Sequence, residues 1–230
     1  APPLGQGVYL VDIQASYPAI DWSTLDRLYL EGGEYKYLRI GNLPARSPNR
    51  PLVITNINGQ VRVGGQDHYY LFVLSGGANW IVTGKYDPIS MTGDAAFVGH
   101  RGNDYTNTRG TYGILVDDDF HLFGTGNSGI SVSSNVPVGI VSPPTSDYEL
   151  SFIEIREVGF AGMSLKTDDG TVPMNNVRSS RAARHRATAG ESQATAATVT
   201  ATEVLIARTQ PEADGTGGRG ITVQAGAQLT

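Results

Sequence analysis

The chain lacks cysteine altogether and has few charged residues. The absence of cysteine excludes disulfide bonds, cysteine-type zinc sites and thiol nucleophiles. Charged side chains make up only 17% of the 230 residues and the net charge is −5, whereas a nucleic-acid-binding protein should carry a basic stripe. The composition therefore argues against nucleic acid as a partner. The four histidines have no zinc-type spacing, and no Gly-x-Ser-x-Gly nucleophile elbow occurs.

Long apolar segments are lacking as well. No stretch approaches the roughly 18 residues that a transmembrane helix needs, and no basic-plus-apolar signal peptide is present. The first residues, Ala-Pro-Pro-Leu, are typical of a mature end left after signal removal, although an engineered start would look the same. We therefore expect a secreted protein, extracellular or at the cell surface, without a membrane span.

Glycine, in contrast, is abundant and spread along the chain. Short β-branched runs, most of them ending in Gly, Asn or Asp, recur at residues 37–42, 52–56, 61–65, 80–84, 112–116 and 152–156. Short strands separated by tight corners are what a solenoid of stacked β-coils requires. The sequence therefore predicts an all-β solenoid over residues 28–230, preceded by an N-terminal cap segment over residues 1–27.

A polar insertion interrupts this pattern at about residues 86–111. It is poor in strand signals and rich in Gly, Asn, Thr and Arg. Long polar insertions in rigid solenoids commonly provide binding surfaces. The candidate substrate-binding residues in it are His100, Arg101, Tyr105 and Arg109.

A second segment, at about residues 179–202, is rich in Ala, Thr, Ser and Arg. Val199 is its single large aliphatic residue, so the segment cannot bury enough apolar surface to fold on its own. Two explanations stay open. It is a flexible excursion, or it is an out-of-frame translation of a normal coil, because such a composition is typical of a shifted GC-rich reading frame.

The stretches at residues 38–44, 79–87 and 159–168 resemble secreted bacterial right-handed parallel β-helix proteins, the broad pectate-lyase-like superfold. The likeness spans about residues 25–178, and residues 203–230 more loosely. It implies a right-handed parallel β-helix. The superfold includes polysaccharide lyases, glycoside hydrolases, epimerases, adhesins and phage spikes, so it does not choose among these functions.

The resemblance implies one candidate catalytic group. Lyases of similar fold use Lys or Arg to remove the proton α to a uronate carboxylate, and they commonly use Ca²⁺ to neutralise that carboxylate. Lys166 would then be the base and Arg156 a substrate clamp, both on outward faces of neighbouring strands. Glu154, Asp168 and Asp169 would be available as Ca²⁺ ligands. The alternative is an ordinary exposed, salt-bridged face.

A second candidate Ca²⁺ site is Asp117-Asp118-Asp119, which directly follows a predicted strand. Three successive carboxylates repel one another unless a cation or backbone amides compensate. Ca²⁺ takes roughly six to eight oxygen ligands. A solvated acidic turn is the alternative.

The sequence leaves two functions open, and it does not decide whether the chain is an enzyme. One is an extracellular protein that binds or processes a polysaccharide or cell-surface glycan on its outward face. Six aromatic side chains are then either sugar-stacking platforms or internal packing: Tyr69, Tyr70, Trp80, Tyr86, Tyr105 and Tyr112. The other is a non-catalytic structural, adhesive or filament-forming protein that self-associates through its solenoid ends.

Overall fold

The computed structural model describes residues 8–10, 12–64, 70–84, 112–117, 128–133, 145–156, 161–167, 171–175, 178–180, 184–189, 198–202, 205–207, 222–224 and 228–229. These residues are mostly strands, and every strand pairing among them is parallel. The predicted all-β class is therefore confirmed.

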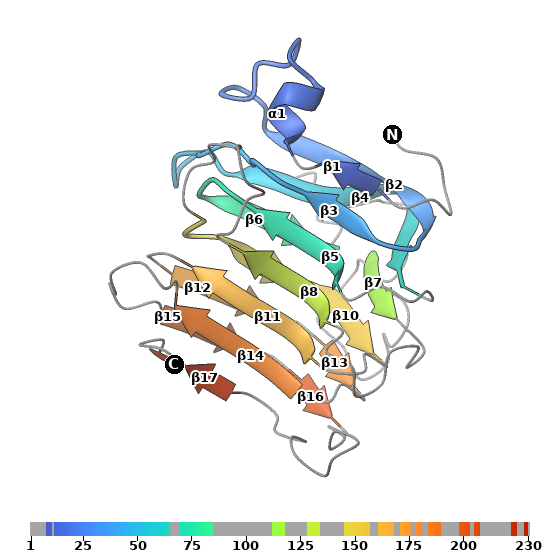
Figure 1. Cartoon of the computed structure of the whole chain (residues 1–230), viewed down its shortest axis with the longest axis vertical. Coiled ribbons are helices and arrows are strands. Elements are labelled where there is room, and N and C mark those ends of the chain that lie inside the picture. Colours follow the sequence, from blue (N-terminus) through green and yellow to red (C-terminus); the bar gives the residue numbers. More distant parts are fainter. Residues whose placement is uncertain are drawn as a thin grey trace.

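The strands form three parallel ladders (Figure 1). Ladder 1 contains, in spatial order, β1 (Val8–Leu10), β3 (Leu38–Ile40), β5 (Tyr70–Ser75), β8 (Ser128–Ser133), β11 (Ala161–Thr167), β14 (Arg184–Ala189) and β17 (Thr222–Gln224). Ladder 2 contains the first halves of β2 (Arg27–Tyr35) and β4 (Leu52–Val63), then β6 (Trp80–Thr83), β9 (Glu149–Ser151), β12 (Thr171–Asn175), β15 (Thr198–Thr202) and β18 (Gln228–Leu229). Ladder 3 contains the second halves of β2 and β4, then β7 (Ile114–Asp117), β10 (Ile153–Arg156), β13 (Arg178–Ser180) and β16 (Leu205–Ala207).

Strands that follow one another along the chain belong to different ladders. The chain runs through β6, β7 and β8, then through β9, β10 and β11, and each strand of the second set pairs with its counterpart in the first. The sets β12–β14 and β15–β17 repeat this order. Residues distant in sequence are thus side by side within a ladder, whereas neighbours in sequence are not.

The core is a continuous apolar column inside the ladders. Successive side chains on a strand point to opposite faces, so every second residue is directed inward. Ile54 of β4, Val82 of β6 and Leu150 of β9 occupy one such inward row, and all three are fully buried. Branched and aromatic side chains suit these rows because they pack against the neighbours above and below.

A small cap covers the first coil at the N-terminal end (Figure 1). The cap contains α1 (Ile13–Ser16), whose N-cap residue Asp12 accepts a hydrogen bond from the backbone N–H of Ala15 at 2.8 Å. Ile13 is buried in the core, and its N–H donates to the carbonyl of Gly41 at 2.9 Å. This packing covers an edge that would otherwise be open to another chain.

Strands continue through the Ala/Thr/Arg-rich segment. β14 and β15 pair in parallel with β11 and β12, and Val199 lies opposite Val172. Threonine is β-branched and favours strands, and the preceding coil offers backbone donors and acceptors along its edge. The flexible excursion considered for residues 179–202 therefore contains paired strands.

Gly84, which directly follows β6, lies too close to the neighbouring backbone for a side chain. A Cβ added to Gly84 would lie 2.6 Å from the carbonyl oxygen of Phe152 and 2.7 Å from the backbone nitrogen of Ile114. Both neighbours are backbone atoms, which cannot move aside as a flexible side chain would. We expect Gly84→Ala to lower the free energy of unfolding by about 1–3 kcal/mol through overpacking. Thermal melts of both proteins measure this, and an unchanged midpoint would contradict this close packing.

Candidate functional site

Two polar turn residues set the direction in which the chain enters the strands of the candidate site. Asn79 directly precedes β6, and Asp147 is two residues before the start of β9. Both have left-handed backbone, with φ of 55° and 47°. Asn and Asp adopt this conformation more readily than other L-residues. The Asn79 N–H donates to the Asp147 carbonyl at 2.9 Å, so the two turns stack. Both strands consequently begin with the same orientation.

The residue that follows each turn points inward. Trp80 and Tyr148 are fully buried, and their rings stack with centroids 4.6 Å apart and planes 14° apart. The Trp80 indole N–H donates to the Gly76 carbonyl at 3.0 Å. Burial raises the pKa of the Tyr148 phenol, so it stays neutral. Trp80, like Tyr112, is buried, so the sugar-stacking role considered for these two side chains is wrong and they serve as internal packing.

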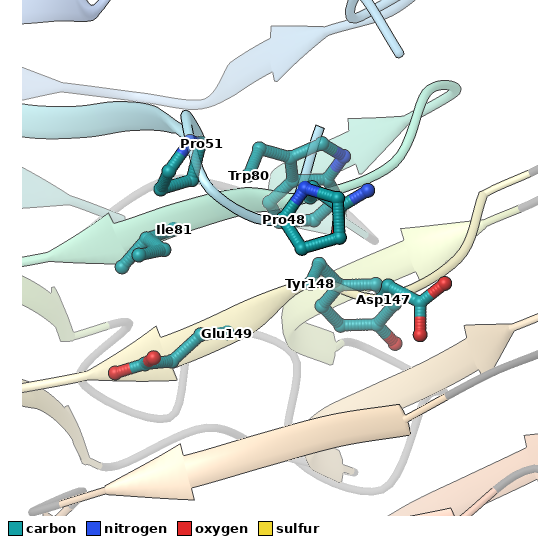
Figure 2. Close-up of a pocket in the computed structure, with 8 residues that line it drawn as sticks. Pro48, Pro51, Trp80, Ile81, Asp147, Tyr148 and Glu149 are labelled. Atoms are coloured by element: carbon teal, nitrogen blue, oxygen red, sulfur yellow. The ribbon is translucent and has the colours of Figure 1, made fainter. Parts of the chain in front are cut away.

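The next residue after each of these aromatic residues points outward. Ile81 of β6 lies opposite Glu149 of β9 in the register of ladder 2, and both are half-buried. Asp147, in the turn before β9, lines the same pocket as Ile81 and Glu149. Figure 2 shows the Asp147 and Glu149 carboxylates on opposite sides of the Tyr148 ring.

A loop at residues 44–51 forms the facing wall. Pro48 and Pro51 belong to it, and Arg46 anchors it because its buried side chain donates to the carbonyls of Trp22 and Ser23 in the N-terminal cap. The backbone N–H of Arg46 donates to the Ala78 carbonyl at 2.9 Å. The wall is thus tied to the cap and to the segment before β6.

A second anchor lies at Asp26. Arg50 donates from Nε to Asp26 Oδ1 at 2.7 Å, and this hydrogen bond lowers the pKa of the Asp26 carboxyl. Arg46 Nη2 lies 3.6 Å from the same carboxylate oxygen. Asn79 completes the attachment by donating from Nδ2 to the Arg46 carbonyl at 2.7 Å. Both arginines of the loop therefore bind groups outside the pocket lining.

Together these elements enclose a pocket of about 460 Å³ (Figure 2). Its lining consists of Pro48, Pro51, Asn79, Trp80, Ile81, Asp147, Tyr148 and Glu149. Two carboxylates and one amide supply the polar side chains, whereas the prolines and the isoleucine supply apolar surface. None of these lining residues is cationic. Such a surface can accept hydrogen bonds and pack against apolar C–H groups.

The structure brings together two residues that the sequence analysis assigned to separate sites. Asp117 and Arg156 are opposite each other in β7 and β10, and Arg156 Nε donates to Asp117 Oδ2 at 2.7 Å. Arg62 Nη2 donates to the same oxygen at 3.3 Å and its Nε lies 3.7 Å from Glu34 Oε2. The Asp117 side chain is only 4% exposed. Two guanidinium groups already neutralise this carboxylate, so the described residues around it do not form a Ca²⁺ site.

Glu154 is not on an exposed surface. Its neighbours Ile153 and Ile155 point inward as predicted, yet the Glu154 side chain is also fully buried. It lies opposite Leu115 of β7, which is buried as well. The expectation that Glu154 is exposed is therefore wrong, because strand alternation decides which face a residue occupies and not whether that face meets solvent.

Lys166 does not lie in the same sheet as Glu154 and Arg156. It belongs to β11 in ladder 1, opposite Thr188 of β14, whereas Glu154 and Arg156 belong to β10 in ladder 3. The expectation that these residues lie on neighbouring strands is wrong, because strands consecutive in sequence enter different ladders. The other predicted site residues lie outside the described part of the chain: His100, Arg101, Tyr105, Arg109, Asp118, Asp119, Asp168 and Asp169.

The described residues contain no group of three or more His, Cys, Asp or Glu side chains placed to hold a metal ion. They also contain no helix with the length and apolar character needed to cross a membrane.

Apart from Trp80, no residue of the pocket lining was predicted from the sequence as a site residue. The sequence does contain one signal, a tripeptide pattern shared by two coils. In both copies a turn-forming polar residue is followed by an aromatic residue and then by an outward residue: Asn79-Trp80-Ile81 and Asp147-Tyr148-Glu149. This pattern recurs at the same position of two coils, which is the kind of repeat that marks equivalent places in a solenoid.

Comparisons with protein-family models, with curated proteins and with solved structures gave no match to this chain. The geometry of the described residues is therefore the basis for a functional proposal.

Proposed function

We propose that this chain is a right-handed parallel β-helix that binds a polysaccharide or cell-surface glycan outside the cell. The observation that carries the binding proposal is the 460 Å³ pocket on the outer side of ladder 2. Support for the fold comes from the order in which the chain visits three all-parallel ladders. Crossover connections between parallel strands of one sheet are right-handed in the great majority of proteins.

The pocket lining matches the surface of a sugar ring. Sugars present hydroxyl groups around the ring and apolar C–H groups on its faces. The carboxylates of Asp147 and Glu149 accept hydrogen bonds from hydroxyl groups, and charged acceptors form the stronger bonds. Pro48, Pro51 and Ile81 provide apolar area for the C–H faces. The volume lies in the range of about 300–1,000 Å³ that is usual for small-molecule sites.

The walls of the pocket are held in place before a ligand arrives. Arg46 ties the proline loop to the cap, and Asn79 ties it to the turn before β6. The Trp80–Tyr148 stack fixes the strands beneath. A site whose walls are already ordered loses less conformational entropy on binding.

We assign binding rather than catalysis to the described residues. Arg156 is engaged by Asp117, and Lys166 belongs to a different ladder. The described geometry therefore assembles no base with a substrate clamp. Self-association through the N-terminal end of the solenoid is disfavoured because α1 and the buried Trp22 cover the first coil.

Binding to a panel of neutral oligosaccharides, measured by isothermal titration calorimetry, tests this proposal. We expect at least one glycan to bind, and we expect the double variant Asp147→Asn/Glu149→Gln to bind it at least about tenfold more weakly, since hydrogen bonds to charged groups contribute about 1.5–3 kcal/mol each. Asparagine at position 147 tolerates the left-handed backbone there.

The matched control is Glu34→Gln, which removes one exposed carboxylate from ladder 3, away from the pocket lining. It should leave the affinity unchanged. If no glycan in the panel binds, or if the control weakens binding as much as the double variant, the pocket is not the glycan site.

A further inference from the structure

The corner between the two halves of β4, at residues 58–60, lies outside the strand pairing. The pairing of β2 with β4 advances from Glu31 to Gly33 in β2 while it advances from Ile57 to Val61 in β4. The extra residues of β4 form a bulge in the ladder. The pairings of β4 with β6 and β7 leave the same residues without a ladder partner within the described chain. The backbone of this corner is therefore less constrained than that of the strands beside it.

An asparagine followed by a glycine occupies this corner. Asn58 is exposed and has a left-handed backbone with φ of 59°, and its Nδ2 donates to Glu31 Oε1 at 2.9 Å. Gly59 has φ of 127°, a conformation that residues with a side chain rarely adopt. Because Gly59 has no side chain, its backbone nitrogen can approach the Asn58 side-chain amide without steric hindrance from its own Cβ.

We propose that Asn58 is a modification site, at which the asparagine converts spontaneously to aspartate and isoaspartate. The Gly59 backbone nitrogen attacks Asn58 Cγ and loses its proton as the new C–N bond forms. The Cγ–Nδ2 bond breaks, and ammonia leaves with that proton. Water then opens the resulting succinimide at either carbonyl, which gives aspartate or isoaspartate. Nothing is oxidised or reduced, water is the only co-reactant, and the reaction does not depend on the glycan-binding pocket.

Two other asparagines share the backbone conformation of Asn58 but not its surroundings. Asn42 and Asn79 have φ of 54° and 55°, and their Nδ2 atoms also donate hydrogen bonds, at 2.8 and 2.7 Å. Both asparagines are half-buried, and they are followed by the fully buried side chains of Leu43 and Trp80. A large packed side chain hinders the approach of the backbone nitrogen that carries it. These two asparagines are therefore internal controls for the proposed site.

Both products would disturb the packing of β2 against the corner. A Cβ added to Gly32 would lie 2.7 Å from the Gly59 carbonyl carbon and 2.9 Å from the Asn58 carbonyl oxygen, so the two backbones are in direct contact. Isoaspartate adds a methylene carbon to the main chain at this contact. Aspartate keeps the length of the main chain but replaces the donor to Glu31 with a second carboxylate. Modification should therefore weaken the pairing of β2 with β4.

Peptide mapping of the folded protein by mass spectrometry, before and after prolonged incubation at physiological pH and temperature, tests the proposal. We expect the peptide with Asn58 to gain the mass that exchange of an amide NH₂ for a hydroxyl group gives. Its rate should be at least about tenfold above the rates at Asn42 and Asn79. Electron-transfer fragmentation then distinguishes isoaspartate from aspartate.

A synthetic peptide with the sequence of β4 gives the rate of the same reaction without the fold. If Asn58 stays unchanged in the folded protein while the peptide converts, the corner prevents the reaction and the proposal is overturned. Conversion of Asn42 or Asn79 as fast as Asn58 would also overturn it, because neither exposure nor the following glycine would then select the site.

Variants test the origin of the mass gain and its consequence. Asn58→Gly removes the reactive amide, tolerates the left-handed backbone and should abolish the mass gain. Asn58→Asp reproduces one product, and we expect it to lower the melting midpoint by about 1–4 °C. Combining it with Glu31→Gln should restore the midpoint, since this removes the facing carboxylate. A mass gain that persists in Asn58→Gly would overturn the assignment, and an unchanged midpoint in Asn58→Asp would overturn the inferred weakening of the pairing.

Discussion

Replacing Trp80 with alanine is expected to lower the free energy of unfolding by about 3–5 kcal/mol. Trp80 is fully buried, its ring stacks on Tyr148 at 4.6 Å, and its indole N–H satisfies the Gly76 carbonyl. Truncation would leave a cavity between two coils and a buried carbonyl without that donor. Denaturant unfolding followed by circular dichroism measures the change. Because Trp80 also supports the pocket, glycan affinity should fall with it.

Trp80→Phe is the matched variant. It keeps an aromatic ring for stacking on Tyr148 but removes the indole donor to Gly76, so we expect a smaller loss of about 1–3 kcal/mol. The difference between the two variants separates packing from hydrogen bonding. An alanine variant that unfolds within about 0.5 kcal/mol of the parent, as ordinary surface substitutions do, would mean that this stack does not hold the coils together.

The strand content of the fold could be predicted from local pattern. Residues 52–56 and 80–84 are rich in β-branched side chains and end in turn-forming residues. Leu52–Thr55 and Trp80–Thr83 pair with each other in ladder 2. Periodicity also identified Ile153 and Ile155 as inward residues, and both are buried. Such signals act over a few residues, so the sequence displays them directly.

Contacts between coils could not be predicted in the same way. The Asp117–Arg156 ion pair depends on which strands share a ladder, and the sequence separation between them includes parts of two coils. Lys166 is closer to Arg156 in sequence and yet belongs to another ladder. The burial of Glu154 likewise depends on what packs outside the strand. Local alternation contains no information on either point.

The pocket required the same long-range information. Asn79 and Asp147 are separated in sequence by the polar insertion of about residues 86–111, and their stacking follows from the pairing of β6 with β9. The third contributor, the loop at residues 44–51, comes from the preceding coil. Composition marked that loop as irregular, but only the coil register places its prolines in the same pocket lining as Glu149.

Removing the charge of Asp117 is expected to lower the free energy of unfolding substantially. Asp117→Asn is nearly isosteric, but it leaves Arg156, whose side chain is only 23% exposed, without its 2.7 Å carboxylate partner. Breaking a buried ion pair costs about 3–5 kcal/mol. We expect about 3 kcal/mol, the lower end of that range, because Arg62 is 41% exposed and water can solvate part of the freed charge.

The control for this effect is Glu34→Gln, which removes the other carboxylate near Arg62. Glu34 is 67% exposed and lies 3.7 Å from Arg62, so its loss should change stability by less than about 1 kcal/mol. The contrast follows from burial, since both substitutions delete one negative charge beside the same arginine. Chemical denaturation of the two variants under identical conditions measures it. If both variants lose equal stability, the loss comes from the change in net charge and not from the buried Asp117–Arg156 pair, which would contradict the prediction.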